Sequence, residues 1–158
     1  KSYRKSLLSN SNPYTPAVNL VFALDEALKM MRDEGLENIF LRHNKHKLAI
    51  SNAVKALNLK LFADENYLSP SVTAIKTEGM DAEEFRKKIK NDFDILLAGG
   101  QDHLKGKIFR VGHLGYVNDR DIITVVSAIS NTLLELGKIT AQQAGEALVV
   151  VSRYLEKN

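Results

Sequence analysis

The residue most suggestive of chemistry is Arg110, which lies in the middle of the apolar segment KIFRVG at residues 107–112. A guanidinium held on a rigid strand presents a planar fork of N–H donors, and this fork matches a carboxylate with two hydrogen bonds. Two structural roles compete with a carboxylate site: an ordinary salt bridge, or a charge that protects a sheet edge from association. The strand pattern by itself favours these structural roles.

Thr15 is the second candidate, because it stands immediately before Pro16 at the start of an apolar helix pattern. A hydroxyl at a helix start, beside backbone N–H groups that have no helical partner, is a plausible contact for a phosphate. The alternative is that Thr15 caps its own helix, with Pro16 at the first helical position. The sequence pattern favours the cap, although the two roles are compatible.

Two other patterns that suggest chemistry do not meet its requirements. Gly100 and Gly106, the latter followed by Lys107, are separated by five residues instead of the four of a phosphate-binding loop. Ile108 then stands where serine or threonine is needed, and a strand pattern follows where a helix should begin. We therefore interpret this stretch as a glycine-hinged connection between strands.

The four histidines predict no metal site. His43 and His46 are three residues apart on a predicted helix, but no HExxH motif or carboxylate cluster supplies a third ligand. His103 lies in the glycine-rich loop and His113 in the turn after a strand, and the role of both stays open. The chain has no cysteine, which excludes disulfides and thiolate metal sites, and no serine sits in a G-x-S-x-G motif.

The elements that must position these residues alternate between helical and strand periodicity. Two long helices are predicted first, at residues 16–34 before Gly35 and at residues 36–57, and a polar, irregular segment at residues 1–13 precedes them. Four short strands are predicted at residues 59–62, 71–76, 95–98 and 107–112. Three further helices are predicted to start at the caps Asp81, Asn118 and Thr140.

This order predicts an α+β fold, in which a small, mainly antiparallel sheet of about four strands packs against helices. The two long N-terminal helices and an extra C-terminal helix are part of the prediction. With 158 residues, of which 44% are hydrophobic, the chain is long and apolar enough for one domain with a real core. A net charge of +3, no long apolar run and no cysteine lead us to expect a cytoplasmic protein that binds neither nucleic acid nor membranes.

Three segments resemble the C-terminal region of class V aminotransferases, pyridoxal-phosphate enzymes of fold type I that include alanine–glyoxylate and serine–pyruvate aminotransferases. They are YTPAVNL at residues 14–20, ALDEAL at residues 23–28 and LAGGQDHLKGKIFRVGHLG at residues 97–115. The last is the most specific, and the resemblance covers about residues 1–137. Some relatives are labelled small subunits of a soluble hydrogenase, but a chain without cysteine offers no thiolate for nickel or iron–sulfur ligation.

The resemblance implies that this chain is the C-terminal small domain of a larger enzyme. The family's Schiff-base lysine, and the aspartate that pairs with the pyridine nitrogen, lie upstream in the large domain. The chain begins with Lys1, as expected for a piece of a longer protein. The implied partners are the missing large domain, a second copy in a homodimer, and a small amino acid with a 2-oxo acid. Alone, the chain should bind no pyridoxal phosphate and catalyse nothing.

Residue roles follow from the same resemblance. Arg110 matches the family arginine that binds the substrate α-carboxylate, which makes this role the favoured one. Thr15 matches a residue that reaches the cofactor phosphate across the dimer interface. Gly99 and Gly100 are expected to allow close backbone approach near the substrate. No catalytic residue of the family falls within this chain.

The resemblance also divides the chain into an interdomain and phosphate-contact loop at residues 1–15, a small domain at residues 16–137 and a helical extension at residues 138–158. Apolar residues of this extension repeat like heptad positions, so a stripe must be covered by this domain or by a partner. These residues are Ala144, Leu148, Val151 and Leu155. The competing hypothesis is a stand-alone α+β binding module that docks through this last helix.

Overall fold

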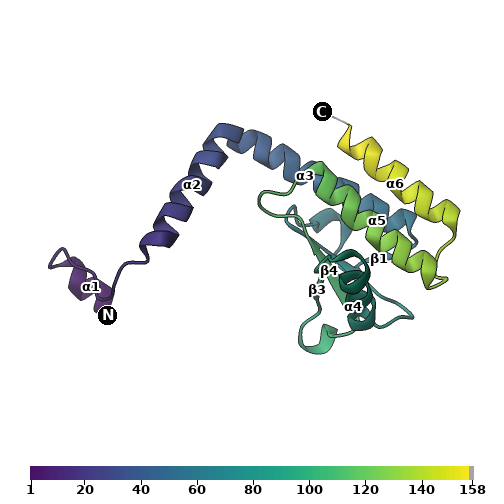
Figure 1. Cartoon of the computed structure of the whole chain (residues 1–158), viewed down its shortest axis with the longest axis horizontal. Coiled ribbons are helices and arrows are strands. Elements are labelled where there is room, and N and C mark those ends of the chain that lie inside the picture. The colour runs from purple at the N-terminus through teal and green to yellow at the C-terminus, as the bar shows by residue number, and fades with distance from the viewer. Residues whose placement is uncertain (157–158) are drawn as a thin grey trace. The chain divides into compact units, whose positions relative to one another are not determined.

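The computed structural model describes residues 1–156, which fall into two units, Lys1–Ile39 and the residues from Phe40 onward. The first unit contains helices α1 (Ser2–Leu7) and α2 (Val18–Glu34), joined by an irregular segment (Figure 1). Helix α1 corrects the prediction that residues 1–13 are irregular throughout. Its sequence SYRKSL contains good helix formers, and Arg4 and Lys5 lie in its last turn, where positive charge is favourable.

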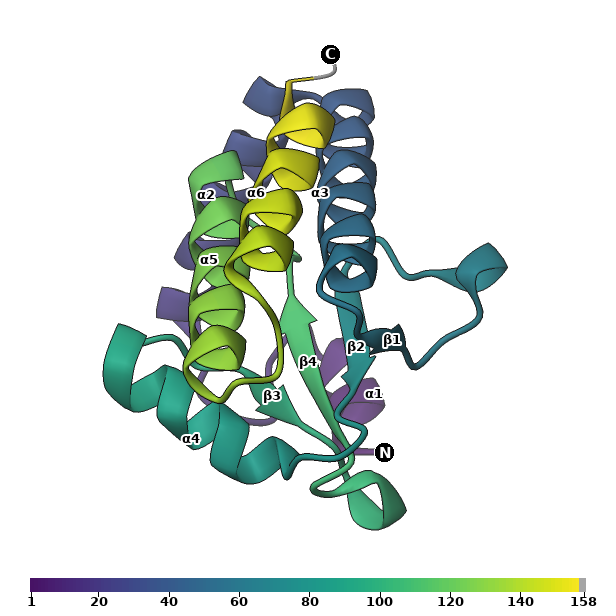
Figure 2. The ribbon, with the colours of Figure 1, turned by 90° about the vertical axis from the view of Figure 1, so that its right-hand side faces the viewer.

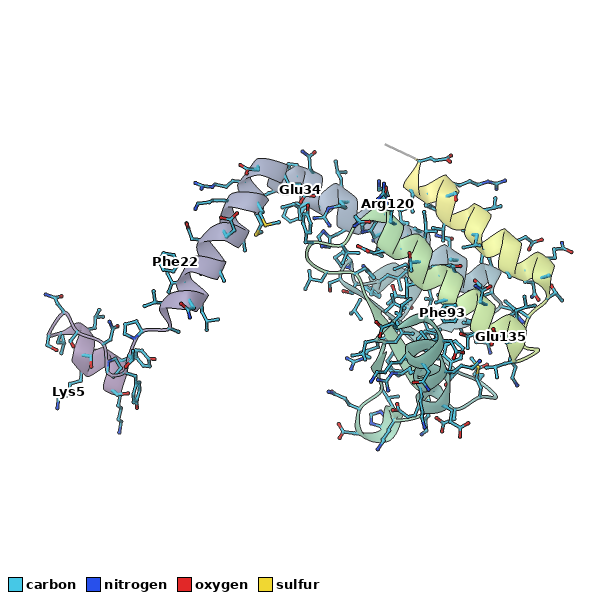
Figure 3. All side chains as sticks on the ribbon, viewed as in Figure 1. Lys5, Phe22, Glu34, Phe93, Arg120 and Glu135 are labelled. Carbon is cyan, nitrogen blue, oxygen red and sulfur yellow. The ribbon has the colours of Figure 1, made fainter. Side chains whose placement is uncertain are left out.

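Helix α2 begins later than predicted. Its N-cap is Ala17, which offers no side-chain hydrogen bond, so the prediction that Thr15 caps a helix with Pro16 at its first position is wrong. The Val18 amide instead donates to the Pro16 carbonyl, and this tight turn delays the helix. No residue of α2 is buried, and the side chain of Phe22 projects from it (Figure 3).

The second unit is built on a four-stranded sheet in the order β1-β2-β4-β3, with every neighbouring pair antiparallel (Figure 2). The strands are β1 (Lys60–Leu61), β2 (Val72–Lys76), β3 (Ala98–Gly99) and β4 (Ile108–Gly112). Helix α3 (Leu36–Ala56) precedes the sheet and contributes seven buried residues to this unit. The predicted α+β class and antiparallel sheet are confirmed.

The remaining helices start where the capping residues predicted. They are α4 (Ala82–Phe93), α5 (Asp119–Glu135) and α6 (Ala141–Leu155), and two single-turn 3₁₀ segments, η1 (Glu65–Tyr67) and η2 (Asp102–Leu104), lie in loops. Asn118 and Thr140 each form a complete capping box with the residue three positions later. None of the helices within residues 1–156 is long and apolar enough to cross a membrane.

The core lies on the face of the sheet that carries the helices. Phe109 and Val111 of β4 point into it, and the Phe109 ring packs on that of Phe85 with centroids 5.1 Å apart. Alternation along the strand therefore places Arg110 on the opposite face. The largest fully buried apolar side chains of this core are Phe85, Phe109, Ile50, Leu57, Ile75, Ile89, Ile122, Ile129, Leu133 and Val126.

Helix α6 is part of this core, lying beside α5 (Figures 1 and 2). Val151 of the predicted stripe is fully buried, as is Ala147 beside it. The other three residues of the stripe, Ala144, Leu148 and Leu155, are partly buried against the core. The stripe is thus covered by the chain's own domain. The competing hypothesis of docking through this helix consequently loses the apolar surface on which it depended.

Candidate functional site

Arg110 occupies the central row of the sheet. In β4 it pairs with Ala74 of β2 on one side and Ala98 of β3 on the other. Because β4 is an interior strand, a protective role at a sheet edge does not apply. The flanking side chains are single methyl groups, so they do not extend over the guanidinium.

The hydrogen bonding of Arg110 leaves most of its donors unused. Its Nε–H donates to the Gly99 carbonyl at 3.0 Å, and the residue is half-buried. Within residues 1–156 no carboxylate forms an ion pair with Arg110, so the salt-bridge alternative has no partner there. Fixing Nε while both terminal amino groups remain without a carboxylate is the arrangement that a bidentate carboxylate contact requires.

The two glycines before this site differ in what a side chain would meet. A Cβ atom on Gly100 would lie 2.1 Å from the Leu104 carbonyl oxygen, so the backbone itself requires glycine there. A Cβ atom on Gly99 would lie 2.5 Å from Nη1 of Arg86 and 2.6 Å from Oε1 of Glu83, the ends of two flexible side chains that would have to move. The segment is followed by η2 and strand β4, which agrees with the rejection of a phosphate-binding loop.

Thr15 lies in the first unit, exposed, in the segment that precedes α2. Since Ala17 occupies the N-cap position, the Thr15 hydroxyl does not serve its own helix. It has no hydrogen-bond partner within the described part of the chain. Its side chain is therefore available to an external group.

Three histidines gather at the loop between β4 and α5, and sequence reasoning missed this cluster. His46 Nε2 lies 2.7 Å from Oδ1 of Asp119, and His43 Nε2 accepts the N–H of Gly115 at 3.2 Å. His113 Nε2 lies 3.0 Å from the Thr73 hydroxyl. The signal for His113 was present in the sequence, because strand alternation from Phe109 through Val111 places it on the buried face.

These histidines hold the loop at residues 113–118 against α3. All three are buried, and Arg42 of the same helix adds hydrogen bonds from Nη1 to the carbonyls of Gly115 and Val117 at 3.0 and 2.9 Å. Across residues 1–156 no group of three histidine or acidic side chains is placed to hold a metal ion. The cluster's role is thus to fasten the loop that follows the Arg110 strand.

Burial is the main cause of two lowered pKa values in this cluster. It lowers the pKa of His113 to about 4; a backbone hydrogen bond at Pro70 opposes this shift, and the proximity of His46 and His43 adds to it. Burial also lowers the pKa of His46, despite its hydrogen bond to Asp119. For Asp119, partial burial raises the pKa, but the hydrogen bonds from His46 and Lys45 outweigh it, and the net shift is downward.

The chain is similar over most of its length to part of several aminotransferases, and its fold matches the C-terminal domain of solved class V aminotransferases. No family model matches it.

Particular relatives make the match concrete. The chain is 55% identical over 135 residues to the soluble hydrogenase 42 kDa subunit of Anabaena cylindrica, covering 85% of this chain and 35% of the relative. It is 35% identical over 149 residues to the serine–glyoxylate aminotransferase of Methylorubrum extorquens, covering 92% and 36%. The crystal structure of ureidoglycine–glyoxylate aminotransferase from Bacillus subtilis superposes with a TM-score of 0.83 at 32% identity, covering 92% and 38%. The chain thus spans little more than a third of these proteins' length.

Proposed function

We propose that this chain is the substrate-binding C-terminal domain of a pyridoxal-phosphate-dependent aminotransferase, which transfers an amino group between a small amino acid and a 2-oxo acid in the cytoplasm. The observation that carries the proposal is Arg110, an interior-strand arginine whose terminal donors have no carboxylate within residues 1–156. The 35% sequence identity to a serine–glyoxylate aminotransferase supports the reaction class. Selectivity for the side chain of the donor amino acid is expected to come from residues outside this chain.

Arg110 has the task of orientation. Both substrates carry a carboxylate beside the reacting carbon, and two parallel charge-assisted hydrogen bonds from one guanidinium fix the direction of that carboxylate. The substrate's Cα–H bond is thereby held in one orientation toward the base that removes its proton. An amino acid and an oxo acid present the same carboxylate, so one arginine serves both halves of the reaction.

Thr15 is the residue of this chain that fits the cofactor. Its exposed hydroxyl, which does not cap α2, suits a hydrogen bond to a phosphate oxygen, and we propose that it completes the site of the other subunit in a homodimer. Pyridoxal phosphate, when bound, supplies the electron sink for charge that develops at the substrate's Cα. The lysine that holds the cofactor covalently would lie in the large domain, so the chain alone is expected to be inactive.

The proposed domain arrangement assigns residues 1–15 to the interdomain and phosphate-contact loop, 16–137 to the small domain and 138–158 to a helical extension. A large domain accounts for the share of the relatives' length that this chain does not span. It also accounts for α2, whose apolar side chains are exposed along its length: Leu20, Val21, Leu24, Leu28 and Met31. We propose that the large domain covers this helix.

The test is substitution of Arg110 in the complete enzyme. Arg110→Met is expected to raise the KM for the amino acid and for the oxo acid by about 100-fold, since removing a charged hydrogen-bonding partner costs about 1.5 to 3 kcal/mol or more. The cofactor's absorption spectrum should remain unchanged. Arg110→Lys should lie between the two, because it keeps the charge but loses the planar fork.

Arg120→Met is the matched control, because Arg120 is an exposed arginine at the start of α5 (Figure 3). Its kinetic constants should equal those of the unaltered enzyme. Unchanged KM values for both substrates in Arg110→Met would refute the carboxylate role. A loss of bound cofactor in that variant would instead assign Arg110 to the cofactor.

A further inference from the structure

We propose that Arg86, on helix α4, is a positioning residue for Arg110. It holds strand β3 in place, so that the Gly99 carbonyl fixes the guanidinium of Arg110 for an incoming carboxylate. The structural part of this inference stands on contacts within the chain, and its kinetic consequence rests on the proposed function.

Arg86 connects α4 to the start of β3. Its Nε–H donates to the Leu97 carbonyl at 2.7 Å, and its Nη1 forms an ion pair with Oε2 of Glu83, also at 2.7 Å. Leu97 immediately precedes Ala98 and Gly99, the two residues of β3. A strand this short has little pairing of its own, so the hydrogen bond from the helix supplies a restraint that the sheet cannot.

Gly99 lies between the two arginines. The place where a Cβ would stand is filled by Nη1 of Arg86 and the Glu83 carboxylate, and the carbonyl of the same residue accepts the Nε–H of Arg110 at 3.0 Å. Any movement of β3 away from α4 therefore moves the acceptor on which Arg110 depends. The absence of a side chain at Gly99 is what allows Arg86 this close to the strand.

The two arginines differ in how their charges are used. The side chain of Arg86 is 23% exposed, and its charge is balanced by Glu83. Arg110 has no such counterion within residues 1–156. Glu83 thus neutralises the charge of Arg86, while the anchored Nε of Arg110 removes part of the rotational freedom that this side chain would otherwise lose on binding a carboxylate.

The structural test uses the 158-residue chain and observes the Arg110 Nε–H group by NMR. In the unaltered chain this group should show slow hydrogen exchange and a through-bond coupling to the Gly99 carbonyl carbon. Arg86→Met should speed that exchange by about tenfold or more, as expected when a hydrogen bond worth about 1.4 kcal/mol is lost. Lys90→Met, an exposed substitution on the same helix, should leave it unchanged.

Glu83→Gln keeps the inference testable if Arg86→Met does not fold. It leaves the hydrogen bond of Arg86 to Leu97 available but removes the counterion, so a smaller increase in exchange is expected. If a folded Arg86→Met chain kept both the slow exchange of the Arg110 Nε–H and its full coupling to the Gly99 carbonyl carbon, the positioning role would be overturned. If only Glu83→Gln folds, the same result in that variant would overturn it.

The kinetic test separates this inference from the proposed function. In the complete enzyme, Arg86→Met should raise the KM for both substrates by about tenfold with an unchanged cofactor spectrum, a smaller effect than that of Arg110→Met. Arg86→Lys should restore part of the loss, since it can still pair with Glu83. If Arg110→Met has normal kinetics, the proposed function fails while the NMR result stands; if only Arg110→Met is impaired, the positioning role fails.

Discussion

Helices α2 and α5 have the same length, 17 residues, and both show an apolar stripe in the sequence, yet they have opposite environments. Eight residues of α5 are buried, including Ile122, Ile129 and Leu133. No residue of α2 is buried, and Leu24 near its middle is 58% exposed. An apolar stripe therefore predicts which face of a helix packs against other residues, but it does not predict whether those residues belong to the same domain, another domain or another chain.

The ends of the two helices differ in the same direction. Asn118 and Asp121 form a reciprocal capping box at the start of α5, whereas Ala17 at the start of α2 accepts no amide through its side chain. Asp119, in the first turn of α5, is also tied to His46 and Lys45. Helix α5 is thus fixed by its own chain at its end and along its face, and α2 is the helix that a large domain would have to support.

The largest expected effect comes from truncating matched leucines. Leu133→Ala removes a fully buried side chain of α5 and should lower the free energy of unfolding by about 2 to 5 kcal/mol, through lost burial and the cavity it leaves. Leu24→Ala in α2 should change it by less than about 0.5 kcal/mol. Urea unfolding of the two variants measures both values, and equal losses would contradict the difference between the helices.

The second effect is a pH dependence of the free energy of unfolding, which arises from the buried histidines next to the loop between β4 and α5. Between about pH 6.5 and 4 the unfolded chain protonates His113 while the folded chain keeps it neutral, so the unfolded state binds more protons. The contribution of His113 to the free energy of unfolding is therefore fully present above pH 6.5. It is lost as the pH drops toward 4, which lowers the free energy of unfolding by about 3 kcal/mol. His46 acts in the same direction. Urea unfolding at a series of pH values measures the slope.

Substituting one histidine at a time assigns that slope. His113→Gln keeps a group able to reach Thr73 and should flatten the decline between pH 6.5 and 4, even if it lowers stability at neutral pH. The exposed His103 provides the control, and His103→Gln should retain the full slope. An unchanged slope in His113→Gln would show that the buried cluster does not govern the acid sensitivity.

The smallest effect concerns the helix starts. Asn118→Ala removes the cap of α5 and should cost about 1 kcal/mol of unfolding free energy. Ala17→Ser supplies the hydroxyl that α2 lacks and should increase its helix content, seen by circular dichroism, with little change in the unfolding midpoint. A large stabilisation by Ala17→Ser would show that α2 already shares the cooperative unfolding of α5.

The elements that the sequence predicts well are those with local signals. Asp81, Asn118 and Thr140 mark the starts of α4, α5 and α6, because a cap is a contact among residues a few positions apart. The start of α2 was misplaced because Thr15 and Ala17 compete for one cap position and the turn at Pro16 decides between them. Such a choice depends on backbone geometry that residue types do not specify.

The features of the site also divide into those that a local sequence pattern predicts and those that depend on tertiary contacts. The placement of Arg110 within a strand follows from the alternation of its neighbours, and the resemblance to the family suggests its role. The hydrogen bond to Gly99, and the contact of Arg86 with that glycine, join residues on separate elements, so no local pattern contains them. The histidine cluster escaped prediction for the same reason, since His46 and His113 meet only after the sheet and α3 have packed.

The outer strands of the sheet, β1 and β3, are each two residues long, and β1 carries Lys60. A foreign strand pairs with an edge through a row of unpaired amides and carbonyls, and two residues offer too short a row for a stable ladder. The fold is thereby protected against the growth of sheets from chain to chain into fibrils.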